Sequence, residues 1–178
     1  MHTLPPRQLL PRQLRALPQP SPQPVDHVAA WRGLTQQGEL AMARGDAVRA
    51  RQLYADALVE ADAIFRAALR GEEEAIRRAP PAYCISCHNV VTLALRQGDD
   101  ATASIFLYRA FARLCDVAES RATLALRARC ALFLDGASRA LIHHLQRIGE
   151  GRLAQEHHAR ADMTIERVRR LQQMAVAQ

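Results

Sequence analysis

The sequence predicts an all-α fold of antiparallel helical hairpins, and its composition and proline distribution support this. Alanine supplies 33 and leucine 22 of the 178 residues, while aromatic residues make up 4%. Such a composition favours helix over sheet. Seven of the nine prolines lie within the first 24 positions, and the other two are Pro80 and Pro81. Because proline interrupts helix interiors, residues 25–79 and 82–178 are both open to long helices. An all-β sandwich and a doubly wound α/β fold are excluded.

Residues 1–27 are rich in proline, arginine and glutamine, and we expect them to form a disordered arm. The Pro-x-x-Pro spacings between Pro18 and Pro24 would suit a ligand for a proline-recognising domain. A solvated linker explains the same composition, and we favour that interpretation. The remaining residues 28–178 are enough for one domain that buries a core without disulfides or metals.

Apolar residues recur at helical steps from residue 28 onward and indicate the first hairpin. Its first helix ends at Gly45-Asp46, where glycine breaks the pattern. Its second helix has a continuous apolar face and ends at Gly71. We expect residues 72–78 to add an exposed helical turn that Pro80-Pro81 terminates. The first hairpin therefore covers residues 28–79.

Two more hairpins follow the same pattern. The second, residues 82–118, is expected to turn at Gly98, and Asp99 or Asp100 can cap its second helix. The third covers residues 121–175 and is expected to turn at Gly149. No proline separates these two units, so we expect a tighter join between them.

Three glycines indicate an internal repeat. Gly45, Gly98 and Gly149 lie 53 and 51 residues apart, each at a predicted turn. Alanines recur five and twelve residues after each glycine: Ala50, Ala103, Ala154, Ala57, Ala110 and Ala161. Small residues at fixed offsets allow two helix backbones to approach closely. The repeat therefore predicts three similar hairpins.

These residues resemble the tetratricopeptide repeat, a helical hairpin with Gly-Asp at its turn and small alanines in its second helix. Further matching positions are Gly38, Ala41, Tyr54 and Asn89. The chain is also similar in pattern to small proteobacterial proteins with tetratricopeptide-like hairpins and a Cys-His-Asn segment, here Cys87-His88-Asn89. The likeness covers about residues 28–175, although the repeat period exceeds the usual length of about 34. It implies a protein-interaction module whose first helices line a concave face.

Carried over through the glycine alignment, the resemblance implies a set of groove-facing residues on the first helix of each hairpin. They are Arg32, Thr35, Glu39, Ile85, His88, Asn89, Thr92, Arg96, Arg139, His143 and Arg147. Arginine and histidine dominate this set, which makes the face basic. Because guanidinium groups bind carboxylates through paired hydrogen bonds, we expect acidic or carboxylate-bearing partner segments. A compact bundle without an open groove is the alternative architecture.

Cys84, Cys87 and His88 form a C-x-x-C-H sequence, which also occurs at sites of c-type haem attachment. They could instead contribute to a redox centre or a zinc site, whose further ligands would come from His143, His144, His157 and His158. However, both cysteines share one predicted apolar stripe with Val91 and Leu95, and free cysteine commonly packs as a small hydrophobe. Packing is the favoured interpretation, so we expect no cofactor. A metal- or redox-responsive role of Cys84, Cys87 and His88 is the alternative function.

The sequence contains no recognisable catalytic pattern. It lacks a glycine-rich phosphate loop, a Ser-His-acid set that can be argued to meet, and paired inward carboxylates. The net charge is +6, all 24 basic residues are arginines, and residues 119–178 carry ten of them against six acids. Without interleaved aromatic residues or a recognition-helix motif, this charge does not indicate nucleic-acid binding.

No membrane span or signal peptide is recognisable, so we expect a cytoplasmic protein with reduced cysteines. The function that follows is a non-enzymatic adaptor or chaperone-like module that binds protein or peptide partners. A secretion-system chaperone of three-repeat type fits the size but not the basic charge. A homo-oligomer is compatible with the sequence.

Overall fold

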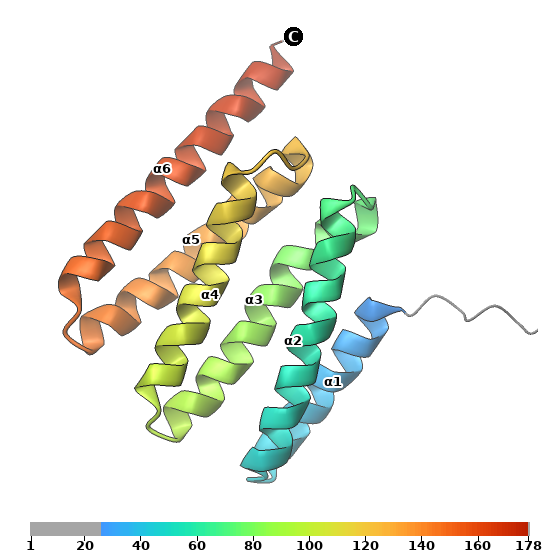
Figure 1. The fold of residues 1–178 in the computed structure, drawn as a ribbon, viewed down its shortest axis with the longest axis vertical. Coiled ribbons are helices and arrows are strands. Elements are labelled where there is room, and N and C mark those ends of the chain that lie inside the picture. Colours follow the sequence, from blue (N-terminus) through green and yellow to red (C-terminus); the bar gives the residue numbers. More distant parts are fainter. Residues whose placement is uncertain (1–25, 178) are drawn as a thin grey trace, which may run out of the picture.

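The computed structural model describes residues 26–177, which form six α-helices (Figure 1). They are α1 (His27–Ala43), α2 (Ala47–Leu69), α3 (Glu73–Arg96), α4 (Asp100–Glu119), α5 (Leu124–Arg147) and α6 (Gly151–Val176). No strand occurs among these residues, so the predicted all-helical fold is confirmed. The arm expected over residues 1–27 lies almost entirely outside the described part of the chain.

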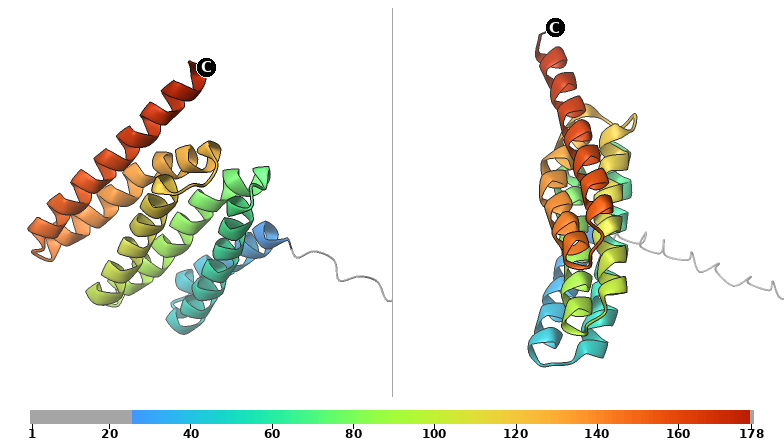
Figure 2. Two further views of the ribbon diagram at one scale, coloured as in Figure 1. Left: turned by 45° about the horizontal axis from the view of Figure 1, so that its top comes forward. Right: turned by 90° about the vertical axis from the view of Figure 1, so that its left-hand side faces the viewer.

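Consecutive helices pack against one another as antiparallel hairpins. The helices form two layers, with α1, α3 and α5 in one and α2, α4 and α6 in the other (Figure 2). Each helix therefore has neighbours both within its own layer and across the layers. In the described part of the chain, no helix has the length and apolar character needed to cross a membrane.

The repeated glycines make the turns within the hairpins. Gly45, Gly98 and Gly149 have φ values of 76°, 71° and 86°, in the left-handed region where glycine is favoured. At the second turn the Asp99 carboxylate accepts from the backbone N–H of Thr102 at 2.9 Å and so caps α4. The turn positions and this cap agree with the sequence-based prediction.

The boundary between the first and second hairpins lies at Gly71, so its predicted position at Pro80-Pro81 is wrong. Gly71 has a φ of 90°, and the N–H of Glu72 donates to the carbonyl of Ala67 at 3.3 Å. Both prolines lie inside α3. The three hairpins accordingly span residues 27–69, 73–119 and 124–176 instead of 28–79, 82–118 and 121–175.

Tertiary packing explains why α3 continues through two prolines. A proline in a helix interior costs about 3 kcal/mol or more because it removes a hydrogen bond and crowds the preceding turn. Here Pro80 is fully buried, and Ala79 and Ala82 on either side belong to the main core. Glu73 and Glu74 also lie in the first turn, where negative charge is favourable, and form ion pairs with Arg77.

The repeated alanines lie in the core, as their fixed offsets predicted. All six are at most 4% exposed: Ala50, Ala57, Ala103, Ala110, Ala154 and Ala161. Close helix approach also explains Gly38 in α1, because a Cβ placed there would lie 2.4 Å from the ring of Tyr54 in α2. Small residues thus set the spacing of the helices that carry the candidate site.

Candidate functional site

The predicted groove residues lie on α1, α3 and α5, which share one layer (Figure 2). Thr35 is buried and Asn89 is half-buried, whereas the other nine are exposed. Arg147 is engaged by Asp100 of α4, and Arg139 pairs with Asp135 one turn earlier at 2.8 Å. Arg32 and Arg96 form no ion pair with any residue from 26 to 177. This layer therefore presents scattered polar groups, and of the predicted residues His88 lines a cavity.

That cavity, of about 300 Å³, lies between α3, α4 and α5 and is also lined by Cys84 and Cys87. Burial raises the pKa of each of these two thiols to about 12, so both are protonated at neutral pH. Cys87 and Val91 are buried, but Leu95 is 42% exposed and leaves the predicted apolar stripe. No three His, Cys, Asp or Glu side chains among residues 26–177 are placed to hold a metal ion. The C-x-x-C-H segment therefore lacks converging partners for a four-ligand zinc site.

One histidine of each adjacent pair turns inward, and each has its own contact. His144 is buried and its Nε2 lies 2.7 Å from the hydroxyl of Ser104 in α4. His157 packs its ring on Phe111 of α4, with centroids 5.1 Å apart. His143 and His158 are exposed. His144 and His157 thus contribute to packing between α4 and the third hairpin.

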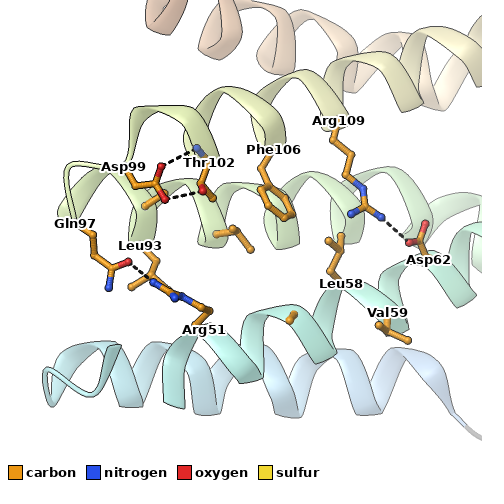
Figure 3. A pocket seen from close by; sticks show the side chains of 13 residues that line it. Arg51, Leu58, Val59, Asp62, Leu93, Gln97, Asp99, Thr102, Phe106 and Arg109 are labelled. Atoms are coloured by element: carbon orange, nitrogen blue, oxygen red, sulfur yellow. Dashed lines mark hydrogen bonds and ion pairs between the residues drawn. The ribbon is translucent and has the colours of Figure 1, made fainter. Parts of the chain in front are cut away.

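An open cleft of about 430 Å³ lies between α2 and α4, with α3 as its floor (Figure 3). Leu58 from α2 and Phe106 from α4 point into it from opposite sides. The other apolar residues of its lining are Ala55, Val59, Val90, Leu93 and Ala94. Its volume falls in the range of about 300–1,000 Å³ that is usual for ligand sites.

Polar side chains line one end of the cleft, next to the turn between α3 and α4. An Arg51 N–H donates to Oε1 of Gln97, the residue directly after α3, at 2.6 Å, and Arg51 has no ion-pair partner among residues 26–177. Asp99 lies at the same end, but its two oxygens accept from the hydroxyl and the backbone N–H of Thr102. These bonds hold the pKa of Asp99 below its usual value, with a smaller contribution from the charge of Arg51. The guanidinium of Arg51 therefore keeps free donors.

Arginines also dominate the second end of the cleft. Arg109 of α4 donates from Nε to the hydroxyl of Tyr83 at 2.9 Å and from Nη2 to Asp62 of α2 at 3.2 Å. Arg113 lies 3.6 Å from the other oxygen of Asp62. Two guanidinium groups therefore share one carboxylate, so this end carries excess positive charge.

The equivalent gap between α4 and α6 is filled. His157 and Phe106 both follow their turn glycine by eight residues. The His157 ring packs on Tyr108 and Phe111, and the hydroxyl of Thr164 donates to Glu119 at 2.6 Å. Phe106 instead borders open space. The α2–α4 cleft is thus open at a repeat position whose counterpart is closed.

The sequence-based prediction did not include Arg51, Phe106 or Arg109 among the binding residues. One signal was available in the repeat, because aligning the glycines places Phe106 opposite His157 and Arg109 opposite Arg160. The first of these pairs differs in size and polarity, which marks the position where the two gaps differ. The distance between α2 and α4 itself could not be read from the repeat.

A model of a protein family described as "Protein of unknown function (DUF2753)" matches residues 29–175. Comparison with curated proteins and with solved structures found no match.

Proposed function

The chain belongs to this DUF2753 family, and we propose that it is a non-catalytic module that binds an acidic or carboxylate-bearing segment of a partner protein. The proposed binding site for this segment is the cleft formed by α2, α3 and α4. The observation that carries the proposal is the cleft itself, which has apolar side chains between an arginine at one end, Arg51, and an arginine at the other, Arg109. Its open state contrasts with the filled gap between α4 and α6.

The chemistry of the cleft supports an apolar segment that carries carboxylates. Burying apolar side chains against Val59, Val90 and Phe106, the more accessible apolar residues of the lining, would supply binding free energy of about 25 cal/mol per Å² of apolar area removed from water. Arg51 can donate further hydrogen bonds to a carboxylate. The main contact with the partner is therefore proposed at this cleft and not at the predicted groove residues on α1, α3 and α5.

The protonated thiols of Cys84 and Cys87 support a non-catalytic function and argue against a redox role. A nucleophilic or metal-binding cysteine needs its thiolate form, whereas burial raises the pKa of Cys84 and Cys87 to about 12. In the cleft, Arg109 is bound to Tyr83 and Asp62, and Asp99 is bound to Thr102. These side chains hold one another and leave no free base beside the apolar middle.

Site-specific photo-crosslinking in the natural host tests the proposal. A benzophenone amino acid at Val59, which is 62% exposed and lines the cleft, should give an adduct with a partner protein. The matched position is Ile105 of α4, which is 61% exposed and does not line the cleft, and it should give none. Arg51→Glu should abolish the Val59 adduct.

A third crosslinking position separates the two candidate surfaces. Thr92 is exposed on α3 and belongs to the predicted groove set. An adduct from Thr92 without one from Val59 would show that the partner contacts the α1, α3 and α5 layer and not the cleft. Equal adducts from Val59 and Ile105 would contradict a specific cleft.

A further inference from the structure

The cleft has no partners for an extended peptide backbone. Its three walls are helices, whose backbone groups are bonded within each helix. Its polar side chains stand at the two ends, with Arg51 and Gln97 at one and Asp62 and Arg109 at the other. An extended chain along the apolar middle would bury its own N–H and C=O groups unpaired, which is costly. A helix pairs its own backbone and presents only side chains.

The two ends of the cleft, each with an arginine, are about three helical turns apart. Arg51 and Asp62 are separated by eleven residues of α2, which corresponds to about 16 Å at about 1.5 Å per residue. Eleven residues also complete close to three whole turns, so both side chains lie on the same side of α2. Arg109 lies beside Asp62, and Arg113 shares that carboxylate. The donors of Arg51 and those of the Arg109–Arg113 end therefore have a fixed spacing.

We infer that the occupant of the cleft is an amphipathic α-helix of a partner protein with two acidic residues about eleven positions apart. Such a helix presents both carboxylates on one face, with apolar residues at three- and four-residue steps between them. One carboxylate meets Arg51 and the other meets the Arg109–Arg113 end, while the apolar residues cover Val90 and Phe106. This inference rests on the proposed function and specifies the partner of the same site.

Three synthetic peptides of equal length and equal net charge test the inference, with binding to the full chain measured by fluorescence anisotropy. The first is a helix with leucines between two glutamates eleven residues apart, the second has its glutamates seven residues apart, and the third carries a central proline that breaks the helix. The first should bind at least about tenfold more tightly than either of the others. Equal binding of the proline peptide would indicate an extended occupant and overturn the inference. If the second peptide binds as tightly as the first, the inferred spacing of about eleven residues between the two acidic residues is wrong.

Charge exchange locates the contact. Arg51→Glu should weaken binding of the first peptide at least about tenfold, and replacing the matching glutamate of the peptide with arginine should restore it. The control is Arg49→Glu, on the same helix, exposed and outside the cleft, which should leave the affinity unchanged. Val59→Glu, at an exposed position of the cleft wall, should also block the peptide. If neither Arg51→Glu nor Val59→Glu affects binding, the helix does not occupy the cleft.

The crosslinking and peptide experiments can fail separately. A partner adduct at Val59 together with no preference among the three peptides would preserve the binding function and overturn the helical occupant. Absence of any Val59 adduct would overturn the proposed function first. Urea unfolding of each variant verifies that a lost interaction does not come from a lost fold.

Discussion

Arg109 in α4 and Arg160 in α6 occupy the same repeat position, and each donates to an acidic residue on the preceding helix of its layer. Arg109 follows Gly98 by eleven residues and reaches Asp62 of α2 at 3.2 Å. Arg160 follows Gly149 by eleven residues and reaches Asp116 of α4 at 3.1 Å. The same link therefore joins α2 to α4 and α4 to α6, although the space beside it is open in the first case and filled in the second.

We expect Arg109→Met to lower the free energy of unfolding by about 1 to 2 kcal/mol. The substitution keeps the aliphatic stem but removes the donors to Tyr83 and Asp62, which are part-buried partners. Arg152→Met is the control, because Arg152 is highly exposed and pairs with Glu156 one turn away on the same helix. It should cost less than about 0.5 kcal/mol. Urea unfolding followed by circular dichroism measures both, and equal effects would show that the Arg109 link contributes nothing beyond a surface pair.

The two interior glycines of α1 should respond oppositely to alanine. At Gly38 a Cβ would meet the Tyr54 ring at 2.4 Å, so Gly38→Ala should destabilise the protein by about 1 to 3 kcal/mol through overpacking. At Gly33 a Cβ would meet nothing within 4 Å, so Gly33→Ala should stabilise it by up to about 1 kcal/mol through helix propensity. Thermal unfolding of both variants checks the sign. A stabilising Gly38→Ala would mean that α1 and α2 are less tightly packed than described.

The four cysteines should react slowly with a thiol reagent in the folded protein. Burial raises the pKa of Cys84, Cys87 and Cys130 to about 12 and that of Cys115 to about 11, from an ordinary value of 9.0. Three pH units correspond to about a thousandfold smaller thiolate fraction. We therefore expect Ellman's reagent at about pH 8 to label all four at least about a hundredfold more slowly than in urea. A thiol that reacts at the unfolded rate would contradict this and favour the redox alternative.

The helix turns could be predicted because they depend on local chemistry. Gly45, Gly98 and Gly149 form the turns that the repeat predicted, with left-handed φ values, and Asp99 caps α4 as its position suggested. The boundary at Gly71 was missed because proline is a strong local signal, whereas the packing of Pro80 is a tertiary effect. Local signals thus located the hairpins but misplaced one junction.

The candidate site could not be derived from the sequence to the same extent. The cleft depends on the separation of α2 and α4, which are neighbours in a layer but not along the chain. Its residues, such as Leu58 and Leu93, look like ordinary core positions in a helical pattern. Arg51 and Arg109 look like solvated charges until their positions at the two ends are known. The one local indication of the cleft in the sequence is that the same repeat position holds Phe106 in α4 and His157 in α6.

The stability of the protein should depend on pH through His157, whose ring fills the gap between α4 and α6. Burial lowers the pKa of His157 below its ordinary value of 6.5, because the ring loses water where it packs on Phe111 and Tyr108. The unfolded chain then takes up a proton at a higher pH than the folded chain. The stability that the neutral ring contributes is therefore complete above pH 6.5 and is lost as the pH falls through the folded pKa.

Replacing the ring tests this dependence. His157→Phe keeps an aromatic contact with Phe111 but cannot titrate, so we expect the free energy of unfolding to fall less between about pH 7.5 and pH 5 than in the unmodified protein. His158→Phe, at the exposed neighbouring position, should not flatten the profile in this way. Urea unfolding at a series of pH values gives the three profiles. If His157→Phe retains the full pH dependence, other groups carry it, and the ring fills the gap without making its closure sensitive to protons.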